Sequence, residues 1–191
     1  TDVFFVVNQQ DKTLNRECLF RTEGTVPERW NPLTGETEKI AIYSTKQKQI
    51  RIPVTFKPRE SLFFIFRKGK PGKSIQKVEL GENQLFPAKD VANLSNPVPN
   101  AVIGDDGNFE FRSYETGTYK FTTDDGETFT SVLKAPETKV IDDLSRKIIF
   151  SPVNHGKIDS VEISGLQSFT DFQEPAIKYF AGTARYRIDF D

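Results

Sequence analysis

Short strand-like segments recur roughly every 8 to 12 residues along this chain, and residues typical of turns separate them. The segment 50–56 is a clear example, because its apolar residues alternate with polar residues and one proline. Such alternation places apolar side chains on one face of a strand and polar side chains on the other. No segment has the sustained apolar spacing of an amphipathic helix. We therefore expect an all-β fold made of antiparallel β-sandwich units.

The same pattern predicts a first domain at residues 1–68. Its strands are expected at Val3–Val7, Asn15–Arg21, Glu38–Tyr43, Ile50–Phe56 and Leu62–Phe66. The Leu62–Phe66 run is apolar at every position, which favours a place in the middle of a sheet. Pro53 has no backbone N–H to donate, so it favours an edge position or a bulge. Residues 67–73 are rich in Lys, Gly and Pro, and we interpret them as a solvated linker rather than a basic docking patch.

A second small antiparallel domain is expected at residues 69–137. Two Asp-Asp-Gly sequences mark turns in it, at 105–107 and 124–126. The first precedes a strand with Phe109 and Phe111, and the second joins Thr118–Thr123 to Thr128–Leu133 in a hairpin. Each acidic loop can also be interpreted as a calcium site, but neither has the Asp-x-Asp-x-Asp-Gly spacing of a calcium-binding hand. Since Asp-Gly is typical of hairpin turns, we adopt the plain turn.

Residues 138–191 are predicted to begin a third domain. Candidate strands are Lys147–Phe150 and Ser160–Ile163, and a last strand is expected at Thr183–Phe190, where apolar and polar residues alternate. An apolar strand face needs neighbours to cover it, and only Asp191 follows. We therefore expect the chain to be a piece of a larger protein. Its last strand should either pair with a strand of its own chain or stand as an exposed edge.

The charge balance argues against two classes of partner. The chain carries 26 basic and 27 acidic residues for a net charge of −1, and both signs are interspersed along the sequence. A nucleic-acid or anionic-membrane surface needs clustered Lys and Arg, so we expect neither partner. No apolar run approaches the roughly 20 residues of a transmembrane helix. Cys18 is the single cysteine, which excludes a disulfide within the chain and leaves the redox compartment open.

Residue types that carry out catalysis are scarce. His155 is the one histidine, lies in a sequence typical of a turn and has no second His or Cys near it, so we expect no zinc site. Cys18 is expected to be a small core residue rather than an activated thiol. A glycosidase needs two carboxylates that face each other across a cleft, and nothing in the sequence pairs any two. We therefore predict no catalytic residue, no metal site and no cofactor.

Trp30 is the first candidate binding residue. It stands directly before Asn31-Pro32 and Thr34-Gly35, which together predict a tight connection, because proline fixes φ and glycine accepts a positive φ. The Trp30 ring could stack on a sugar, as aromatic rings do in carbohydrate sites. It could instead pack across the end of a sandwich core, which is the commoner role of a lone Trp beside a rigid turn and the interpretation that we prefer.

Several segments, in order along the chain, resemble the β-rich region after the catalytic barrel of large bacterial α-L-rhamnosidase-type glycoside hydrolases. They are Phe4–Gln9, Glu28–Gly35 and Ser61–Arg67. Gly117–Phe121 with Asp125-Gly126 is similar to the small β unit that follows in these enzymes, and Ile177–Tyr186 resembles the opening of their galactose-binding-like jelly-roll domain. The chain departs from the family pattern at residues 144–146 and near Phe169, where members carry Trp.

This resemblance implies two small β domains followed by the opening strands of a truncated jelly-roll domain. It also implies a parent glycoside hydrolase whose catalytic carboxylates lie in an upstream barrel, which needs about 250 residues. The upstream catalytic domain would be the partner of this chain, an oligosaccharide would be a second candidate partner, and the parent would be periplasmic or extracellular. The candidate sugar-binding residues are Trp30, Tyr179 and Phe180.

Three functions therefore stay open. The leading hypothesis is a non-catalytic accessory region that supports the catalytic barrel, so that this chain alone is not an enzyme. The alternatives are an independent carbohydrate-binding module and a surface β-sandwich for protein interaction. Sandwich folds host all three functions, so the fold alone cannot separate them.

Overall fold

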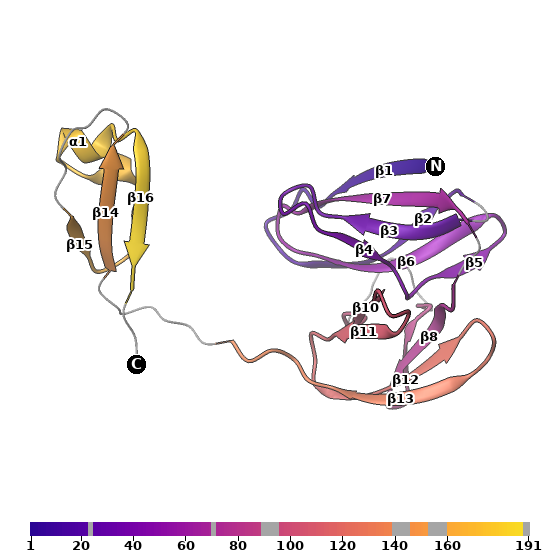
Figure 1. Cartoon of the computed structure of the whole chain (residues 1–191). Coiled ribbons are helices and arrows are strands. Elements are labelled where there is room, and N and C mark those ends of the chain that lie inside the picture. Colours follow the sequence, from indigo (N-terminus) through magenta and orange to yellow (C-terminus); the bar gives the residue numbers. More distant parts are fainter. Residues whose placement is uncertain (23–24, 70–71, 89–95, 139–145, 153–159, 189–191) are drawn as a thin grey trace. The chain divides into compact units, whose positions relative to one another are not determined.

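The computed structural model describes residues 1–22, 25–69, 72–88, 96–138, 146–152 and 160–188. The chain forms two compact units, Thr1–Pro136 and Glu137–Asp191. Strands dominate both units (Figure 1), and the described helices are one 3-10 turn and one short α-helix. All ladders between the named strands are antiparallel. The all-β, antiparallel fold predicted from the sequence is confirmed.

The first unit begins with a β-sandwich of two sheets, ordered β1-β7-β3-β4 and β2-β6-β5. The strands are β1 (Asp2–Val7), β2 (Leu14–Phe20), β3 (Thr25–Trp30), β4 (Thr37–Lys39), β5 (Ser44–Lys46), β6 (Gln49–Phe56) and β7 (Ser61–Lys68). Alternating apolar residues from both sheets form one core, in which the rings of Phe20 and Phe64 lie 4.9 Å apart. As the Leu62–Phe66 run predicted, β7 is a middle strand, between β1 and β3.

Two features of this sandwich, the position of Pro53 and the length of β7, differ from the sequence expectations. Pro53 lies on a middle strand, but beyond the last pair between β5 and β6, Ser44–Arg51. At Pro53, β6 therefore has no partner strand on its β5 side in the described sheet. The N–H that proline lacks does not remove a hydrogen bond from a ladder there. The linker predicted at 67–73 is wrong at its start, because β7 continues to Lys68 and Arg67 forms an ion pair with Glu28 of β3 (Nε–Oε1 2.9 Å). Residues 70–71 lie outside the described residues.

A second layered structure follows within the same unit. It has a four-stranded sheet ordered β13-β12-β8-β9 and a β10–β11 hairpin. The strands are β8 (Ile75–Leu80), β9 (Asn83–Phe86), β10 (Asn100–Ile103), β11 (Phe109–Arg112), β12 (Gly117–Thr123) and β13 (Thr128–Leu133). The rings of Phe111 and Phe121 lie 4.6 Å apart in its core. The plain turns predicted at the two Asp-Gly sequences are confirmed, with Gly107 at φ 82° and Gly126 at φ 85°.

The segment 40–43 belongs to both layers of the first unit. Ile40 and Tyr43 pack in the core of the first sandwich, whereas Ala41 and Ile42 pack in the second core. Its backbone is hydrogen-bonded to the second structure, with Ala41 N–H donating to the carbonyl of Ala101 (2.9 Å) and Tyr43 N–H to that of Ile75 (3.1 Å). The two cores of this unit therefore share one stretch of chain.

The second unit has a three-stranded sheet ordered β15-β14-β16, with β14 (Arg146–Pro152), β15 (Val161–Ile163) and β16 (Gly182–Arg187). A 3-10 turn (η1, Phe169–Asp171) and a short helix (α1, Pro175–Lys178) add Ile177 and several aromatic rings to its core. The last strand pairs with β14 of its own chain and is an outer strand of the described sheet. Phe190, part of the strand predicted at Thr183–Phe190, lies outside the described residues.

Candidate functional site

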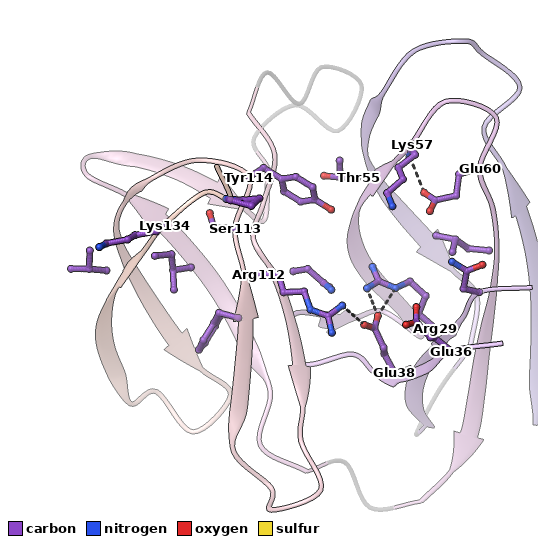
Figure 2. Close-up of a pocket in the computed structure, with 17 residues that line it drawn as sticks. Arg29, Glu36, Glu38, Thr55, Lys57, Glu60, Arg112, Ser113, Tyr114 and Lys134 are labelled. Atoms are coloured by element: carbon purple, nitrogen blue, oxygen red, sulfur yellow. Dashed lines mark hydrogen bonds and ion pairs between the residues drawn. The ribbon is translucent and has the colours of Figure 1, made fainter. Parts of the chain in front are cut away.

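A cleft of about 750 Å³ opens in the first unit, between the ends of its two layered structures (Figure 2). Ligand sites in proteins are usually concavities of this size that combine apolar walls with a few placed polar groups. Apolar parts of the wall come from Leu62, Phe111 and Leu133. The polar parts come from several different strands and turns, and they give the cleft its chemical character.

A triad of charged side chains forms one wall of the cleft. Arg29 and Glu38 lie directly opposite each other on β3 and β4, and the Arg29 Nε donates to Glu38 Oε2 (3.0 Å). Arg112, at the end of β11, donates from Nη1 to Glu38 Oε1 (2.9 Å). The carboxylate is mostly enclosed, with 17% of the Glu38 side chain exposed, whereas 71% of the Arg112 side chain is exposed. Two guanidinium groups on one carboxylate leave an excess of one positive charge at this wall.

An aromatic residue faces the same space from the segment after β11. The side chain of Tyr114 is 48% exposed, and its hydroxyl interacts with that of Thr55 on β6. Thr55 donates its own proton to Asn15 Oδ1 (2.9 Å). Burial raises the pKa of Tyr114, although the nearby Arg29 guanidinium acts against this shift. Tyr114 therefore stays a neutral phenol at physiological pH.

The turn between β6 and β7 supplies Lys57 and Glu60. The backbone N–H of Lys57 donates to Glu60 Oε2 (2.8 Å), which fixes the turn. The Lys57 ammonium is exposed and has no carboxylate within ion-pair distance among the described residues, and the same holds for Lys134 on the opposite wall. Both ammonium groups are therefore available to a bound anion.

The groups in the cleft suit binding better than hydrolysis. Both oxygens of Glu38 accept from guanidinium groups, Glu60 accepts from a backbone N–H, and Glu36, the third carboxylate of the cleft, accepts from the Thr34 hydroxyl (3.1 Å). A general acid or base must be able to exchange its proton with a substrate, and these carboxylates are committed to other donors. Within the part of the chain that the structure describes, no three His, Cys, Asp or Glu side chains are grouped as metal ligands would be. The cleft has four cationic and three carboxylate side chains, so it carries a small excess of positive charge beside its hydroxyl groups and its aromatic ring.

Trp30 does not line this cleft. Neighbouring residues of a strand point to opposite faces, so Arg29 and Asn31 reach the cleft while Trp30 lies on the other face of β3. Its Nε1 donates to Glu28 Oε2 (3.0 Å), and the guanidinium carbon of Arg67 lies 5.7 Å from the centre of its ring. The tight connection predicted after Trp30 is confirmed: Gly35 has φ 76° and its N–H donates to the carbonyl of Asn31 (2.9 Å).

The other two candidate sugar-binding residues belong to the second unit and differ from each other. Phe180 packs into the core of that unit, with its ring 4.9 Å from the ring of Phe150. Tyr179 is 78% exposed, with the Lys178 ammonium 5.9 Å from its ring centre. Of the three residues chosen from the sequence, only Tyr179 presents most of its ring to solvent.

Cys18 and His155 are the two residues considered for thiol or imidazole chemistry. Cys18 is partly buried against the first core, and burial raises its pKa to about 11, so it is a protonated thiol, as the sequence predicted. His155 lies outside the described residues.

Sequence reasoning missed the residues that form the cleft, above all Arg29, Glu38, Arg112 and Tyr114. They come from three separate places in the chain, because Arg112 and Tyr114 are two residues apart, and each looks like an ordinary polar residue of a strand or turn. One signal was present, because Arg29 and Glu38 are opposite charges on either side of a predicted tight turn. Such a turn brings its flanking strands into direct opposition.

Comparisons with known proteins identify no family. No protein-family model matches the sequence, and no curated protein matches it. Among solved structures, the chain is similar to a rhamnosidase from Novosphingobium sp. PP1Y, with 21% sequence identity and a TM-score of 0.49. The similarity covers 96% of this chain, which spans only 12% of that protein's length. None of the described helices is both long enough and apolar enough to cross a membrane. A likeness at this level does not establish membership of a family.

Proposed function

We propose that this chain is a non-catalytic accessory β region of a glycoside hydrolase, and that its first unit packs against the catalytic domain of that enzyme. The ordered motifs that resemble the region after an α-L-rhamnosidase-type barrel support the class of parent protein. One structural observation carries the packing role, namely the row of exposed apolar side chains that β1 places on the outer face of the β1-β7-β3-β4 sheet.

The β1 edge of that outer face is unusually apolar for a sheet surface that faces solvent. On edge strand β1, Val3 is 58% exposed, Phe5 57% and Val7 43%. The Phe5 ring lies 4.8 Å from that of Phe63 on β7, and Phe63 is paired across the sheet with Trp30. A solvated antiparallel sheet normally shows polar residues here, and large exposed apolar patches mark contact surfaces. Each such side chain contributes about 1.5–3 kcal/mol when it is fully buried.

The proposed partner follows from the position of this face. Because β1 is the first strand, a domain encoded upstream of Thr1 would join the chain directly beside it. The barrel of a glycoside hydrolase, with its layer of outer helices, would cover the face and leave the cleft on the opposite side of β3 accessible.

The test is a longer protein that includes the upstream coding sequence, compared with the present chain alone. Phe5→Asp is expected to lower the melting temperature of the catalytic domain in the longer protein, because it buries a charge at the contact. In the chain alone the same change should have little effect, because Phe5 is exposed there. Leu19→Asp is the matched control, since Leu19 is 49% exposed on the other sheet.

Two results would contradict the proposal. One is an upstream sequence that encodes no catalytic domain. The other is turnover of an aryl rhamnoside by the purified chain alone, abolished by a single carboxylate substitution.

Carbohydrate binding by the second unit is a second candidate function, which the 78% exposure of Tyr179 favours. Aromatic rings that are open to solvent stack on the apolar faces of sugars. Calorimetry against plant and bacterial polysaccharides is expected to show binding that Tyr179→Ala removes and Trp30→Ala preserves. Loss of binding in Trp30→Ala with the fold intact would instead assign it to the first unit.

A further inference from the structure

The cleft of the first unit has an arrangement of charge that the accessory role does not use. Glu38 accepts hydrogen bonds from two arginines at once, so the triad carries an excess positive charge that is held in place. Arg112 gives one of its five N–H donors to Glu38, and 71% of its side chain is exposed. An arginine oriented in this way by a carboxylate is already placed to bind a second carboxylate, because its planar guanidinium matches that group.

Lys57 adds a second cation to the same space. Figure 2 shows its side chain and those of Arg29, Arg112 and Tyr114 converging on the cleft. No described carboxylate pairs with the Lys57 ammonium, whereas Glu60 beside it is bound by the backbone of the same turn. A ligand with a carboxylate would therefore meet two cations without displacing an existing ion pair.

The rest of the wall is suited to rings that carry hydroxyl groups. Tyr114 presents a half-exposed aromatic ring, and Asn31, Asn100 and Thr55 line the cleft with amide and hydroxyl groups. Aromatic faces and side-chain amides are the groups that bind the apolar face and the hydroxyls of a sugar. A cleft of about 750 Å³ is within the range for a ligand of a few rings.

We propose that this cleft binds an acidic oligosaccharide, with a uronate carboxylate held by Arg112 and Lys57 and a sugar ring stacked on Tyr114. Neutral sugars would lack the contact with both cations, and small carboxylates would lack the contact with the ring. The site is independent of the proposed contact through β1, so either can fail without the other.

Isothermal titration calorimetry of the chain at low salt tests the site with three probes: linear trigalacturonic acid, neutral cellotriose and citrate. Trigalacturonic acid is expected to bind at least about tenfold more tightly than either of the other two, since a charged hydrogen bond contributes enough for such a ratio. Its affinity should fall when sodium chloride is raised to 0.5 M, because partly exposed charges are screened.

Variants locate the binding in the cleft. Arg112→Ala, Lys57→Ala and Tyr114→Ala are each expected to weaken trigalacturonic acid binding about tenfold or more. The matched controls are Arg185→Ala, Lys46→Ala and Tyr186→Ala, which remove exposed side chains of the same types outside the cleft. Thermal unfolding of every variant confirms that the fold is retained, which is expected because the three cleft residues are exposed.

Each of the other outcomes overturns the proposal. If cellotriose bound as tightly as trigalacturonic acid, the cations would not contribute to the affinity. If citrate bound as tightly, the aromatic ring would not contribute to it. Absence of heat with trigalacturonic acid at 10 mM would show that the cleft has no such ligand. Binding that survives in the three cleft variants would place it elsewhere.

Discussion

Glu17 has a buried carboxyl group, and one of its two oxygens has no hydrogen-bond partner among the described residues. No part of its side chain is exposed, and Oε1 accepts from the backbone N–H of Ala88. The Arg51 Nη1 lies 3.3 Å from Oε2, but in a direction that gives Oε2 no hydrogen bond among the described residues. Desolvation therefore raises the pKa of Glu17, against the smaller opposing effects of Ala88 and Arg51.

This raised pKa predicts a pH dependence of stability. The folded chain binds the Glu17 proton more tightly than the unfolded chain does, so the free energy of unfolding falls as the pH rises from 4.5 towards the raised value. Glu17→Gln keeps an acceptor for Ala88 and removes the charge, so its urea midpoint should fall less over this pH range. Glu82→Gln, in an exposed turn, is the control. Equal pH profiles for wild type and Glu17→Gln would contradict this assignment.

Tyr119 offers a second prediction at this scale. Its side chain has no exposed surface, and its hydroxyl donates to the carbonyl of Glu115 (3.1 Å) while accepting from the Ser113 hydroxyl (3.1 Å). Ser113 also contacts the Glu115 carbonyl (2.7 Å), so that acceptor stays satisfied without the phenol. Tyr119→Phe should therefore cost only about 1 kcal/mol in urea unfolding. A loss of 3 kcal/mol or more would mean that the hydroxyl also supports the segment that carries Tyr114.

Among the elements, the segment 40–43 contributes side chains to both cores of the first unit. Ile42 is 2% exposed in the second core, and its neighbours Ala41 and Tyr43 are hydrogen-bonded to β10 and β8. Ile42→Ala is expected to lower the free energy of unfolding by about 2–5 kcal/mol, measured in urea, because it leaves a cavity where the two layers meet. Leu19→Ala, at a 49% exposed position, should cost much less. Comparable losses in the two variants would show that this junction is not tightly packed.

The sequence predicted those strands whose evidence is local. Alternation located β6, and Asp-Gly located the hairpin of β12 and β13, since both signals lie within a few neighbouring residues. Strands β3, β5, β8, β9 and β10 were missed because their pairing partners are distant or their runs are short. The segment 40–43 was expected to continue a single strand, and only the presence of two cores explains why it turns from one to the other.

The candidate site was predictable to a smaller extent than the strands. The sequence made Trp30 a candidate binding residue with core packing as the commoner role, but the face on which a strand residue lies depends on which neighbouring sheet covers it. In this chain the cleft faces Arg29 and Asn31, and Trp30 lies on the opposite side. Glu38 and Arg112 meet only because β4 and β11 come together in the folded first unit. No local pattern contains that information.

At the scale of the whole molecule, the shared segment predicts how the first unit unfolds. Its two cores have separate side chains but share the backbone stretch Ile40–Tyr43, whose loss exposes both. Two cores that are coupled in this way should unfold in one transition, although each has the size of a small domain. The alternative is two transitions, one for each core.

The single tryptophan makes this coupling measurable. Trp30 lies in the first sandwich, so its fluorescence reports on that part alone. Phe121→Ala removes a fully buried ring of the second core and should cost about 3–5 kcal/mol. If the cores are coupled, this change moves the urea midpoint of Trp30 fluorescence downwards by roughly 1 M or more. Val132→Ala, at a 67% exposed position, should leave it in place. An unmoved Trp30 midpoint in Phe121→Ala would mean that the two cores unfold independently.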